Sequence, residues 1–357
     1  MLKIKKNKGG SITRIGMNPA RNRVSDYHPA RVTVVVLVYI PYLSGYFQYR
    51  LDVLKLCLGS ILKHTEKPYD LFVFDNGSCP EVKRYLRGLM EAGSIQYLFA
   101  AGENVGKIGA FKIMFEAVPG ELIAYADDDI FFYPDWLPAH LELIDGYPRV
   151  GMVSGCAVRT LFTTAVESNL QLADQDPEVT LTRGRTIPEQ WEYEWAESYG
   201  RDPASHLERM QGMEDLIMER RGIKAYAAAN HNQFMAPKNV ITQFLPSVWS
   251  GRLMGQMHEL DLELDAGGYL RLSTMERTTK HMGNLISPSM AEEAALFGVS
   301  VDGTKASPVG APRRSISAGL VQVKPINRLL LALYDRLFWV LNQQSGDWLK
   351  IDRTKRK

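Results

Sequence analysis

Three consecutive aspartates, Asp127, Asp128 and Asp129, directly follow the apolar run at residues 122–126. Such a run is typical of a strand buried on both faces of a parallel sheet. Adjacent carboxylates at the end of that strand repel one another, and their burial costs free energy unless it is compensated. A divalent cation that also binds phosphate oxygens and water resolves the conflict. The pattern therefore predicts a cation site, and the alternative is a solvated acidic turn.

Strand-like and helix-like segments alternate through the first half of the chain. The strand-like runs are residues 32–38, 71–74, 95–99 and 122–126, and the helix-like runs are 51–62, 82–90 and 107–117. This alternation predicts a doubly wound α/β sheet with right-handed crossovers. Ligands of such sheets bind at the carboxyl ends of the strands. The turn at residues 75–78 and the three aspartates should therefore share one edge of the sheet.

The second half of the chain is less regular. We expect a strand at 151–157, an insertion with helices at 159–222, a strand at 225–236, a helix or turn from 259 to 264, a long loop at 286–325 and a helix at 326–341. The domain boundaries that follow are a basic N-terminal tail at 1–30, one domain at 31–285 and a C-terminal extension at 286–357.

The bulk charge of the 357 residues is +2, which indicates no particular partner, but basic residues concentrate at both termini. Basic ends either contact anionic membrane or nucleic acid or are solubilising tails. The three cysteines lie far apart without a CxxC spacing, which argues against disulfides and a thiolate zinc site. No run approaches the ~20 apolar residues of a spanning helix, and the N-terminus lacks a signal-peptide core. We therefore expect a cytoplasmic protein or one that is peripheral at a membrane.

Five segments occur in a characteristic order. They are residues 34–41, 56–62, 72–78, 103–110 and 125–137, the last with the aspartates and a trailing Pro-Asp-Trp-Leu. Together they resemble the GT-A fold glycosyltransferases of family 2 type. The resemblance implies a mixed, mainly parallel sheet flanked by helices, with a nucleotide-sugar-binding half at 31–160 and an acceptor or catalytic half at 223–285. It also implies transfer of a sugar from a nucleotide-diphosphate donor, with a UDP-sugar favoured, to an acceptor hydroxyl with inversion.

The resemblance also implies roles for individual residues. Asp75 should contact the base or ribose, although a plain tight turn is the alternative. The other residues expected near the donor are Pro41, Asn104, Gly106, Lys107, Asp127 and the variable middle residue Asp128. Asp129 should ligate Mn²⁺ or Mg²⁺ at the diphosphate, with Asp127 and His281 as further ligands. Neutral imidazole suits Mn²⁺ better than Mg²⁺.

A carboxylate base must take the proton of the acceptor hydroxyl. In the family it belongs to a Glu-Asp pair before an amphipathic helix. The matching segment here starts at His258 and reads His-Glu at that pair. Glu259 is the base in one register and Asp261 in another, and a third alternative is that both acids only complement a helix dipole.

The acceptor side is weakly marked. His231 and Asn232 follow an Ala-rich run, and Trp191 and Trp195 have rings that stack well on sugars, with ordinary packing as the alternative. The acceptor is expected to be a glycan, a lipid-linked sugar or another hydroxyl compound. The 326–341 helix is either a packing helix or an interfacial membrane anchor.

Two rival functions remain open at this stage. A nucleotidyltransferase would need a Gly-rich triphosphate loop with a basic residue near the first strand, and residues 39–46 lack it. A degenerate module that binds sugar or nucleic acid without turnover is disfavoured by the intact aspartates. The irregular pair at His258 keeps that second alternative open.

Overall fold

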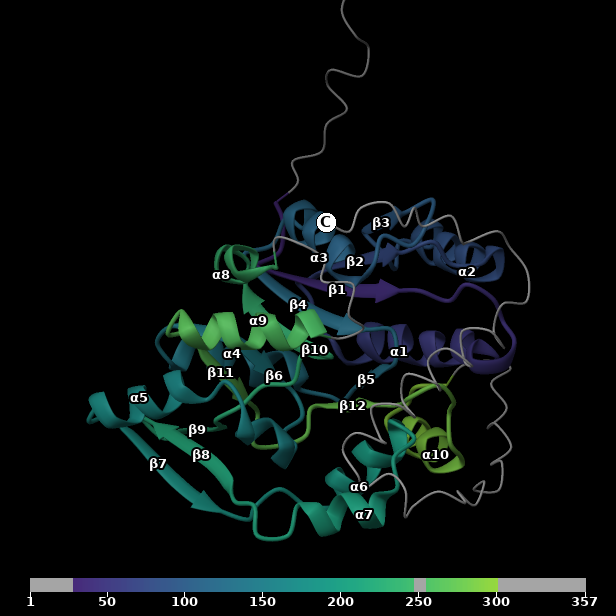
Figure 1. The fold of residues 1–357 in the computed structure, drawn as a ribbon. Helices are drawn as coiled ribbons and strands as arrows, with labels where there is room; N and C mark the ends of the chain where they lie inside the picture. The colour runs from purple at the N-terminus through teal and green to yellow at the C-terminus, as the bar shows by residue number, and fades with distance from the viewer. Residues whose placement is uncertain (1–27, 247–254, 301–357) are drawn as a thin grey trace, which may run out of the picture. The chain divides into compact units, whose positions relative to one another are not determined.

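A ten-stranded mixed sheet runs through residues 28–246 and 255–300, which are the residues that the computed structural model describes (Figure 1). Its strands are β1 (Val32–Val38), β2 (Asp70–Asp75), β3 (Tyr97–Ala100), β4 (Leu122–Asp127), β6 (Val150–Ser154), β7 (Val179–Gly184), β8 (Asp215–Arg220), β9 (Ile223–Tyr226), β10 (Gln233–Pro237) and β11 (Leu270–Ser273). Their order across the sheet is β3-β2-β1-β4-β10-β6-β11-β9-β8-β7. The predicted α/β fold is confirmed.

The parallel half of the sheet brings the ends of β2 and β4 to one level. Every residue of β1 is buried, as its β-branched run requires, and β1 pairs in parallel with both β2 and β4. Val38 is opposite Asp75 on one side, and Leu37 is opposite Asp127 on the other. The predicted edge shared by the residue 75 turn and the aspartates is therefore present.

Strand β10 closes the other side of this edge. It runs antiparallel to β4 with Gln233 opposite Ala126. The backbone N–H of Asp127 donates to the carbonyl of Asn232 over 2.9 Å. The residues just before β10 therefore stand beside the first aspartate.

Helices cover both faces of the sheet. They are α1 (Arg50–His64), α2 (Pro80–Glu91), α3 (Lys107–Ala117), α4 (Trp136–Gly146), α5 (Glu167–Gln175), α6 (Glu189–Ser198), α7 (Pro203–Arg209), α8 (Lys238–Ile241), α9 (Gly255–Ala266) and α10 (Pro288–Leu296). Side chains of α1, α2, α4 and α10 share one apolar cluster with one face of the sheet. Those of α3, α8 and α9 share a second cluster with the opposite face (Figure 1). Alternate residues of β1 and β4 enter each cluster, as the period of two dictates.

A two-stranded ribbon beside the main sheet carries the late histidine. Its strands are β5 (Ile130–Phe132) and β12 (Thr279–His281), which pair antiparallel with His281 opposite Ile130. The backbone N–H of Met282 also donates to the carbonyl of Asp129 over 2.8 Å. This pairing brings His281 to the aspartates from about 150 residues further along the chain.

The structure corrects several predicted elements. The single strand expected at 225–236 is two strands, β9 and β10, which belong to different parts of the sheet. The expected insertion at 159–222 contains strands β7 and β8 as well as helices, and these strands extend the sheet beyond β9. The loop expected from residue 286 contains α10, and the helix expected from residue 259 begins at Gly255. The third strand starts two residues later than expected, at Tyr97.

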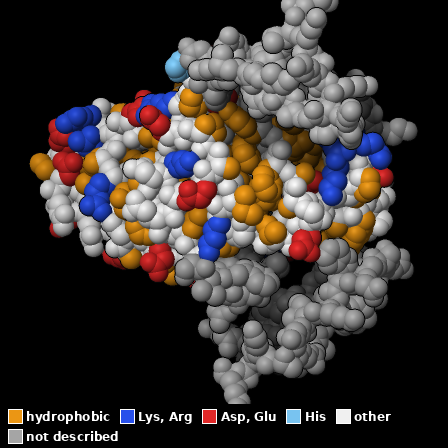
Figure 2. Space-filling model, turned by 90° about the horizontal axis from the view of Figure 1, so that it is seen from above, with side chains coloured by type: hydrophobic (Ala, Val, Ile, Leu, Met, Phe, Trp, Pro, Cys, Tyr) orange, Lys and Arg blue, Asp and Glu red, His pale blue; other side chains and the backbone are white. Residues whose placement is uncertain are grey.

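Two predicted features lie outside the described residues, namely the basic tail up to residue 27 and the helix at 326–341. No helix within residues 28–246 and 255–300 is long and apolar enough to cross a membrane. On the face shown in Figure 2, positive and negative side chains are interspersed over the described surface.

Candidate active site

The loops after β2 and β3 are held together by two asparagines. The side-chain amide of Asn76 donates to Oδ1 of Asn104 over 2.9 Å, and its own oxygen accepts from the N–H of Val105 over 2.9 Å. Oδ1 of Asn104 also accepts from the N–H of Gly106 over 2.7 Å. Gly77 has a φ of +85°, in the left-handed region that favours glycine. The predicted donor residues Asn104 and Gly106 therefore sit directly on the turn that follows Asp75.

Asp75 is a turn residue with one unused oxygen. Its Oδ1 accepts from the N–H of Ser78 over 2.8 Å, which is the tight turn that the sequence offered as the alternative. Its Oδ2 is buried and has no hydrogen-bond partner in the described part of the chain. The tight turn is therefore present, and the contact of the other oxygen with base or ribose stays a prediction. Pro41 is partly buried in the segment after β1, where the N–H of the preceding Ile40 donates to Ser78 Oγ.

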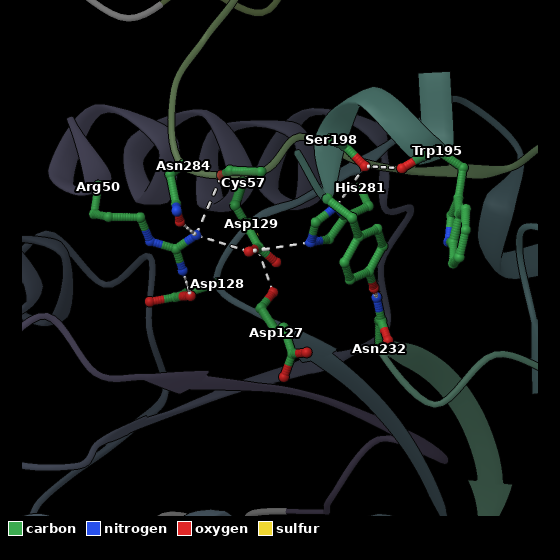
Figure 3. Close-up of polar contacts among 12 residues, drawn as sticks. Arg50, Cys57, Asp127, Asp128, Asp129, Trp195, Ser198, Asn232, His281 and Asn284 are labelled. Atoms are coloured by element: carbon green, nitrogen blue, oxygen red, sulfur yellow. Dashed lines mark hydrogen bonds and ion pairs between the residues drawn. The ribbon is translucent and has the colours of Figure 1, made fainter. Parts of the chain in front are cut away.

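Asp127 is paired with a lysine rather than with the other aspartates. Nζ of Lys107, the first residue of α3, lies 2.7 Å from its Oδ1 and 3.0 Å from its Oδ2. The hydroxyl of Tyr125 donates to Oδ1 as well. In Figure 3 the carboxylate of Asp127 points away from Asp129. The two donor residues Asp127 and Lys107 are therefore in contact, as a shared donor role requires.

Arg50 of α1 bridges the other two aspartates. Its Nη1 lies 2.7 Å from Oδ2 of Asp129, and its Nη2 contacts Oδ1 of Asp128 (Figure 3). Burial raises the pKa of Asp128 to about 7, although the charge of Arg50 opposes this. Burial acts on Asp129 in the same direction, but the charges and hydrogen bonds of His281 and Arg50 hold its pKa below the usual range. A protein cation thus relieves much of the repulsion within the triplet.

His281 lies against Asp129 and is held from behind by α6. Its Nε2 is 3.3 Å from Oδ2 of Asp129, and its Nδ1 is 2.8 Å from Oγ of Ser198 (Figure 3). The ring of Tyr199 stacks on the imidazole, with centroids 4.3 Å apart and planes 10° from parallel. Tyr199 is fixed in turn by a hydrogen bond from the amide of Asn232. The imidazole is therefore locked in position with Nε2 facing the carboxylate.

The predicted metal ligands come together only in part. Asp129 and His281 are adjacent, and buried Oδ1 of Asp129 and Oδ2 of Asp128 have no hydrogen-bond partner among the described residues. A histidine whose other nitrogen is held by a hydroxyl is the usual arrangement of a metal-ligating imidazole. Asp127 does not join them, and within the described residues no three His, Cys, Asp or Glu side chains gather as a metal site. The chain thus offers a pair of ligands that fits a divalent cation whose remaining ligands come from phosphate and water.

The predicted base helix, α9, presents the two candidate bases differently. Asp261 is buried, with Oδ2 3.0 Å from Nδ1 of His231 and Oδ1 3.0 Å from Nη2 of Arg271. Glu259 is half-buried and His258 is exposed. The structure therefore joins Asp261 to His231, which the sequence had assigned to the acceptor side.

A pocket opens beside His281. It is lined by Ile130, Ser154, Cys156, Trp195, Asn230, Asn232, Gln233, Thr279 and His281. Nε1 of Trp195 is buried without a hydrogen-bond partner among the described residues, so it has a donor to offer. Trp191 instead packs in a separate apolar cluster and against the guanidinium of Arg277, 5.6 Å from its ring. Of the two tryptophans expected on the acceptor side, only Trp195 lines this pocket.

Several residues of the site were missed by sequence reasoning, chiefly Arg50, Ser198, Tyr199 and Arg271. Arg50 could have been found, because it shares a helical face with Val53, Leu54 and Cys57, and a lone cation at such spacing calls for a buried partner. Ser198 and Tyr199 carry no such signal, since their role depends on how α6 folds back over the ribbon.

Residues 46–193 match the model of the family described as Glycosyl transferase family 2. A comparison with curated proteins gave no match. Similar solved structures include the mannosyltransferase PcManGT from Pyrobaculum calidifontis in complex with GDP-Man and Mn²⁺, at 22% identity over 40% of this chain and 39% of that one, with a TM-score of 0.32. TarS 1-349 of S. aureus shows 14% identity over 35% of each chain and a TM-score of 0.29. GalNAc-T7 with UDP, GalNAc and Mn²⁺ shows 13% identity over 72% of this chain and 44% of that one, with a TM-score of 0.45.

The part of each of these structures that aligns is less than two thirds of its length. The family match covers β2, β3 and β4, the triple aspartate and the start of the insertion. These are the elements that form the candidate donor site. The match over residues 46–193, together with the mixed sheet and the aspartate triplet at the end of β4, makes this part of the chain similar to the family 2 glycosyltransferases.

Proposed function

We propose that the protein transfers a sugar from a nucleotide-diphosphate sugar to an acceptor hydroxyl in a reaction that depends on a divalent cation. One observation carries the proposal. The ends of β2 and β4 stand at one level on either side of β1, so the turn at Asp75 and the aspartate triplet face the same edge of the sheet. A nucleotide placed there has its base side at Asp75 and its diphosphate side at the triplet. The family resemblance favours a UDP-sugar.

The residues at this edge supply complementary groups for such a donor. The unpaired Oδ2 of Asp75 accepts a hydrogen bond from base or ribose. The ammonium of Lys107 stands at the first residue of α3, where backbone N–H groups also favour an anion. Lys107 therefore binds phosphate, and Asp127 beside it orients the ribose or the sugar.

Asp129 and His281 would hold the cation, with Mn²⁺ preferred over Mg²⁺ because one ligand is an imidazole. Bound there, the cation neutralises the charge that develops on the leaving diphosphate. Arg50 stabilises the same charge from the α1 side, since it already contacts both carboxylates. Ser198 and Tyr199 keep Nε2 of His281 turned toward Asp129.

The acceptor would enter from the α6 and α9 side. The pocket beside His281 offers the indole N–H of Trp195 and the amides of Asn230 and Asn232 to sugar hydroxyls. The pocket itself encloses only about 20 Å³, so an acceptor glycan or the sugar of a lipid-linked acceptor would lie over its mouth and not inside it. On the family resemblance, we infer that the transfer inverts the anomeric carbon.

Thermal unfolding with a panel of nucleoside diphosphates and nucleotide sugars, with and without Mn²⁺, tests the donor site. A ligand at ~100 times its dissociation constant stabilises the folded state by about 2.7 kcal/mol, which is visible as a melting shift. We expect a shift that needs both Mn²⁺ and one nucleotide and that is lost in Asp129→Asn. The exposed Asp145→Asn is the matched control and should keep the shift. A panel without any shift would contradict the proposal.

A further inference from the structure

Three side chains from three different elements form a continuous polar chain behind the candidate site. Nδ1 of His231 is 3.0 Å from Oδ2 of Asp261 on α9, and Oδ1 of the same carboxylate is 3.0 Å from Nη2 of Arg271 on β11. The side chains of Arg271 and Asp261 are 2% and 7% exposed, whereas that of His231 is 22% exposed. Only the histidine end of the chain therefore reaches solvent.

The buried end of this chain is rigid. Nη2 of Arg271 donates to the carbonyl of Ala229 over 2.6 Å, and Nη1 donates to the carbonyl of Ala165 over 3.1 Å. These bonds fix the guanidinium, which in turn fixes the carboxylate of Asp261. An ionised carboxylate is only an acceptor, so the proton shared with His231 resides on Nδ1. The tautomer that results has a free lone pair on Nε2.

The histidine lies on the loop that leads into β10 beside the candidate site. Its neighbour Asn232 accepts from the N–H of Asp127 and donates to the Tyr199 that stacks on His281. Asn230 and Asn232, on either side of His231 in the sequence, both line the pocket beside His281, whereas the side chain of His231 is turned toward Asp261. In the part of the chain that the structure describes, no hydrogen bond engages Nε2.

The same contacts make Asp261 a poor base on its own. Its Oδ2 contacts His231, its Oδ1 is ion-paired with Arg271 over 3.0 Å without a hydrogen bond, and the carboxylate is buried. Its charge is instead available to stabilise an imidazolium at His231, as in the carboxylate-imidazole pairs of acyl-transfer enzymes. Glu259, the other candidate base on α9, shows no ion pair within residues 28–246 and 255–300.

We propose that His231 is the general base of the transfer reaction and that Asp261, held by Arg271, orients it; this rests on the proposed function. Nε2 takes the proton of the acceptor hydroxyl as the acceptor oxygen bonds to the anomeric carbon. The bond from that carbon to the diphosphate oxygen breaks, and its electron pair leaves with the diphosphate. The proton stays on the imidazolium, opposite the negative charge of Asp261, and is lost to solvent after the product departs.

The test uses water as the acceptor, because hydrolysis of the donor needs the same proton transfer. Wild type, His231→Ala and His231→Gln are incubated with UDP-glucose, UDP-GlcNAc, UDP-galactose and GDP-mannose in Mn²⁺, and the release of nucleoside diphosphate is measured. We expect both variants to lose ~10²–10⁴-fold in turnover while the melting shift with donor is kept. Added imidazole should restore part of the activity of His231→Ala, which a structural role would not allow.

Two further variants separate the base from its alternatives. Asp261→Asn should lower turnover without loss of donor binding, because the amide no longer favours the proton on Nδ1. Glu259→Gln should retain near-normal turnover, and a loss as large as that of His231→Ala would make Glu259 the base and overturn the proposal. The imidazole ¹⁵N resonances of wild type should show the proton of His231 on Nδ1, and a proton on Nε2 instead would overturn it independently of any turnover.

The outcomes also separate this inference from the proposed function. Donor binding with Mn²⁺ together with near-normal hydrolysis by His231→Ala would refute the base and leave the function standing. Donor binding without any hydrolysis by wild type would likewise refute His231 as the base and leave the proposed function standing. Absence of both binding and hydrolysis would refute the function and the base together.

Discussion

Nη1 of Arg50 lies 2.7 Å from Oδ2 of Asp129, so a helix residue supplies positive charge where the sequence alone points to a metal. The pair is buried, and the same guanidinium contacts Asp128. Removal of one partner from a buried pair leaves an uncompensated charge. We therefore expect Arg50→Met, which keeps the apolar stem, to lower the free energy of unfolding by about 3–5 kcal/mol in urea titrations. The exposed Arg84→Met, which breaks a surface pair with Glu81, should cost less than about 1 kcal/mol. Equal losses in the two variants would contradict this account of Arg50.

The close approach of Gly77 to the loop at Glu103 should link the backbone conformation of this turn to donor binding. A Cβ at this position would lie 2.8 Å from the carbonyl carbon of Glu103, and φ is +85°. Gly77→Ala should therefore displace the loop that carries Asn104, cost about 1–3 kcal/mol and weaken nucleotide binding in calorimetry. Gly93→Ala is the matched control, because it also has a positive φ but meets no atom within 4 Å. If both variants bind nucleotide equally, the close approach at Gly77 has no role in the site.

The hydrogen bond between Ser198 and His281 should determine how tightly the proposed cation binds. Its Oγ lies 2.8 Å from Nδ1 of His281 and fixes the ring. Loss of such a partner typically lowers metal affinity 10–100-fold. We expect Ser198→Ala to weaken Mn²⁺ binding by about that factor in isothermal titration, and the exposed Ser289→Ala to leave it unchanged. Unchanged affinity in Ser198→Ala would remove His281 from the proposed ligand set.

A second buried charge cluster should stabilise the insertion. Nε of Arg159 is 2.9 Å from Oδ1 of Asp215, and the side chains of Arg159, Asp215 and the neighbouring Glu192 are buried. Arg159→Met should therefore cost about 3–5 kcal/mol in chemical denaturation. The exposed pair between Arg31 and Asp145 provides the control, since Asp145→Asn should cost at most about 1 kcal/mol. A cost below 1 kcal/mol for Arg159→Met would show that the cluster is energetically neutral.

The burial of His140 should make the folded protein less stable in mild acid. It is fully buried between Trp136 and Gln233, and burial lowers its pKa to about 4. Between pH 6.5 and pH 4 the unfolded chain binds a proton that the folded chain does not, so the contribution to stability falls with pH over this window. The loss from this group approaches about 3 kcal/mol at the acid end. The difference in unfolding free energy between wild type and the non-titrating His140→Gln should change by that amount from pH 7 to pH 4, and a constant difference would contradict the assignment.

The first half of the fold could be predicted because each strand there has a strong local signal. The apolar run at 32–38 became β1 with the same bounds, and the residues at the ends of β2 and β4 met at one edge as the topology requires. Strand β7 was missed because it is largely exposed and its residues are mostly polar, and β8 was missed because its apolar run is only three residues long, at 216–218.

The candidate site was predictable where the alternation of strands and helices determines which loops meet at one edge of the sheet. Asp127, Lys107, Asn104 and Asp75 fall in this class. The link between His231 and Asp261 spans 30 residues and depends on α9 packing beside β10, which no spacing encodes. Arg271 was missed for the same reason, since its partner lies on another element.

Helix α6 belongs to the insertion and also contributes residues to the candidate site. It begins and ends within residues 159–222, yet its last turn and the residue that follows hold His281, and Trp195 lines the neighbouring pocket. On the proposed function, α6 therefore determines both the shape of the acceptor pocket and the position of the cation ligand His281. Recombination that exchanged this segment between related enzymes would change acceptor choice and metal affinity in a single step, so the two traits should be inherited together.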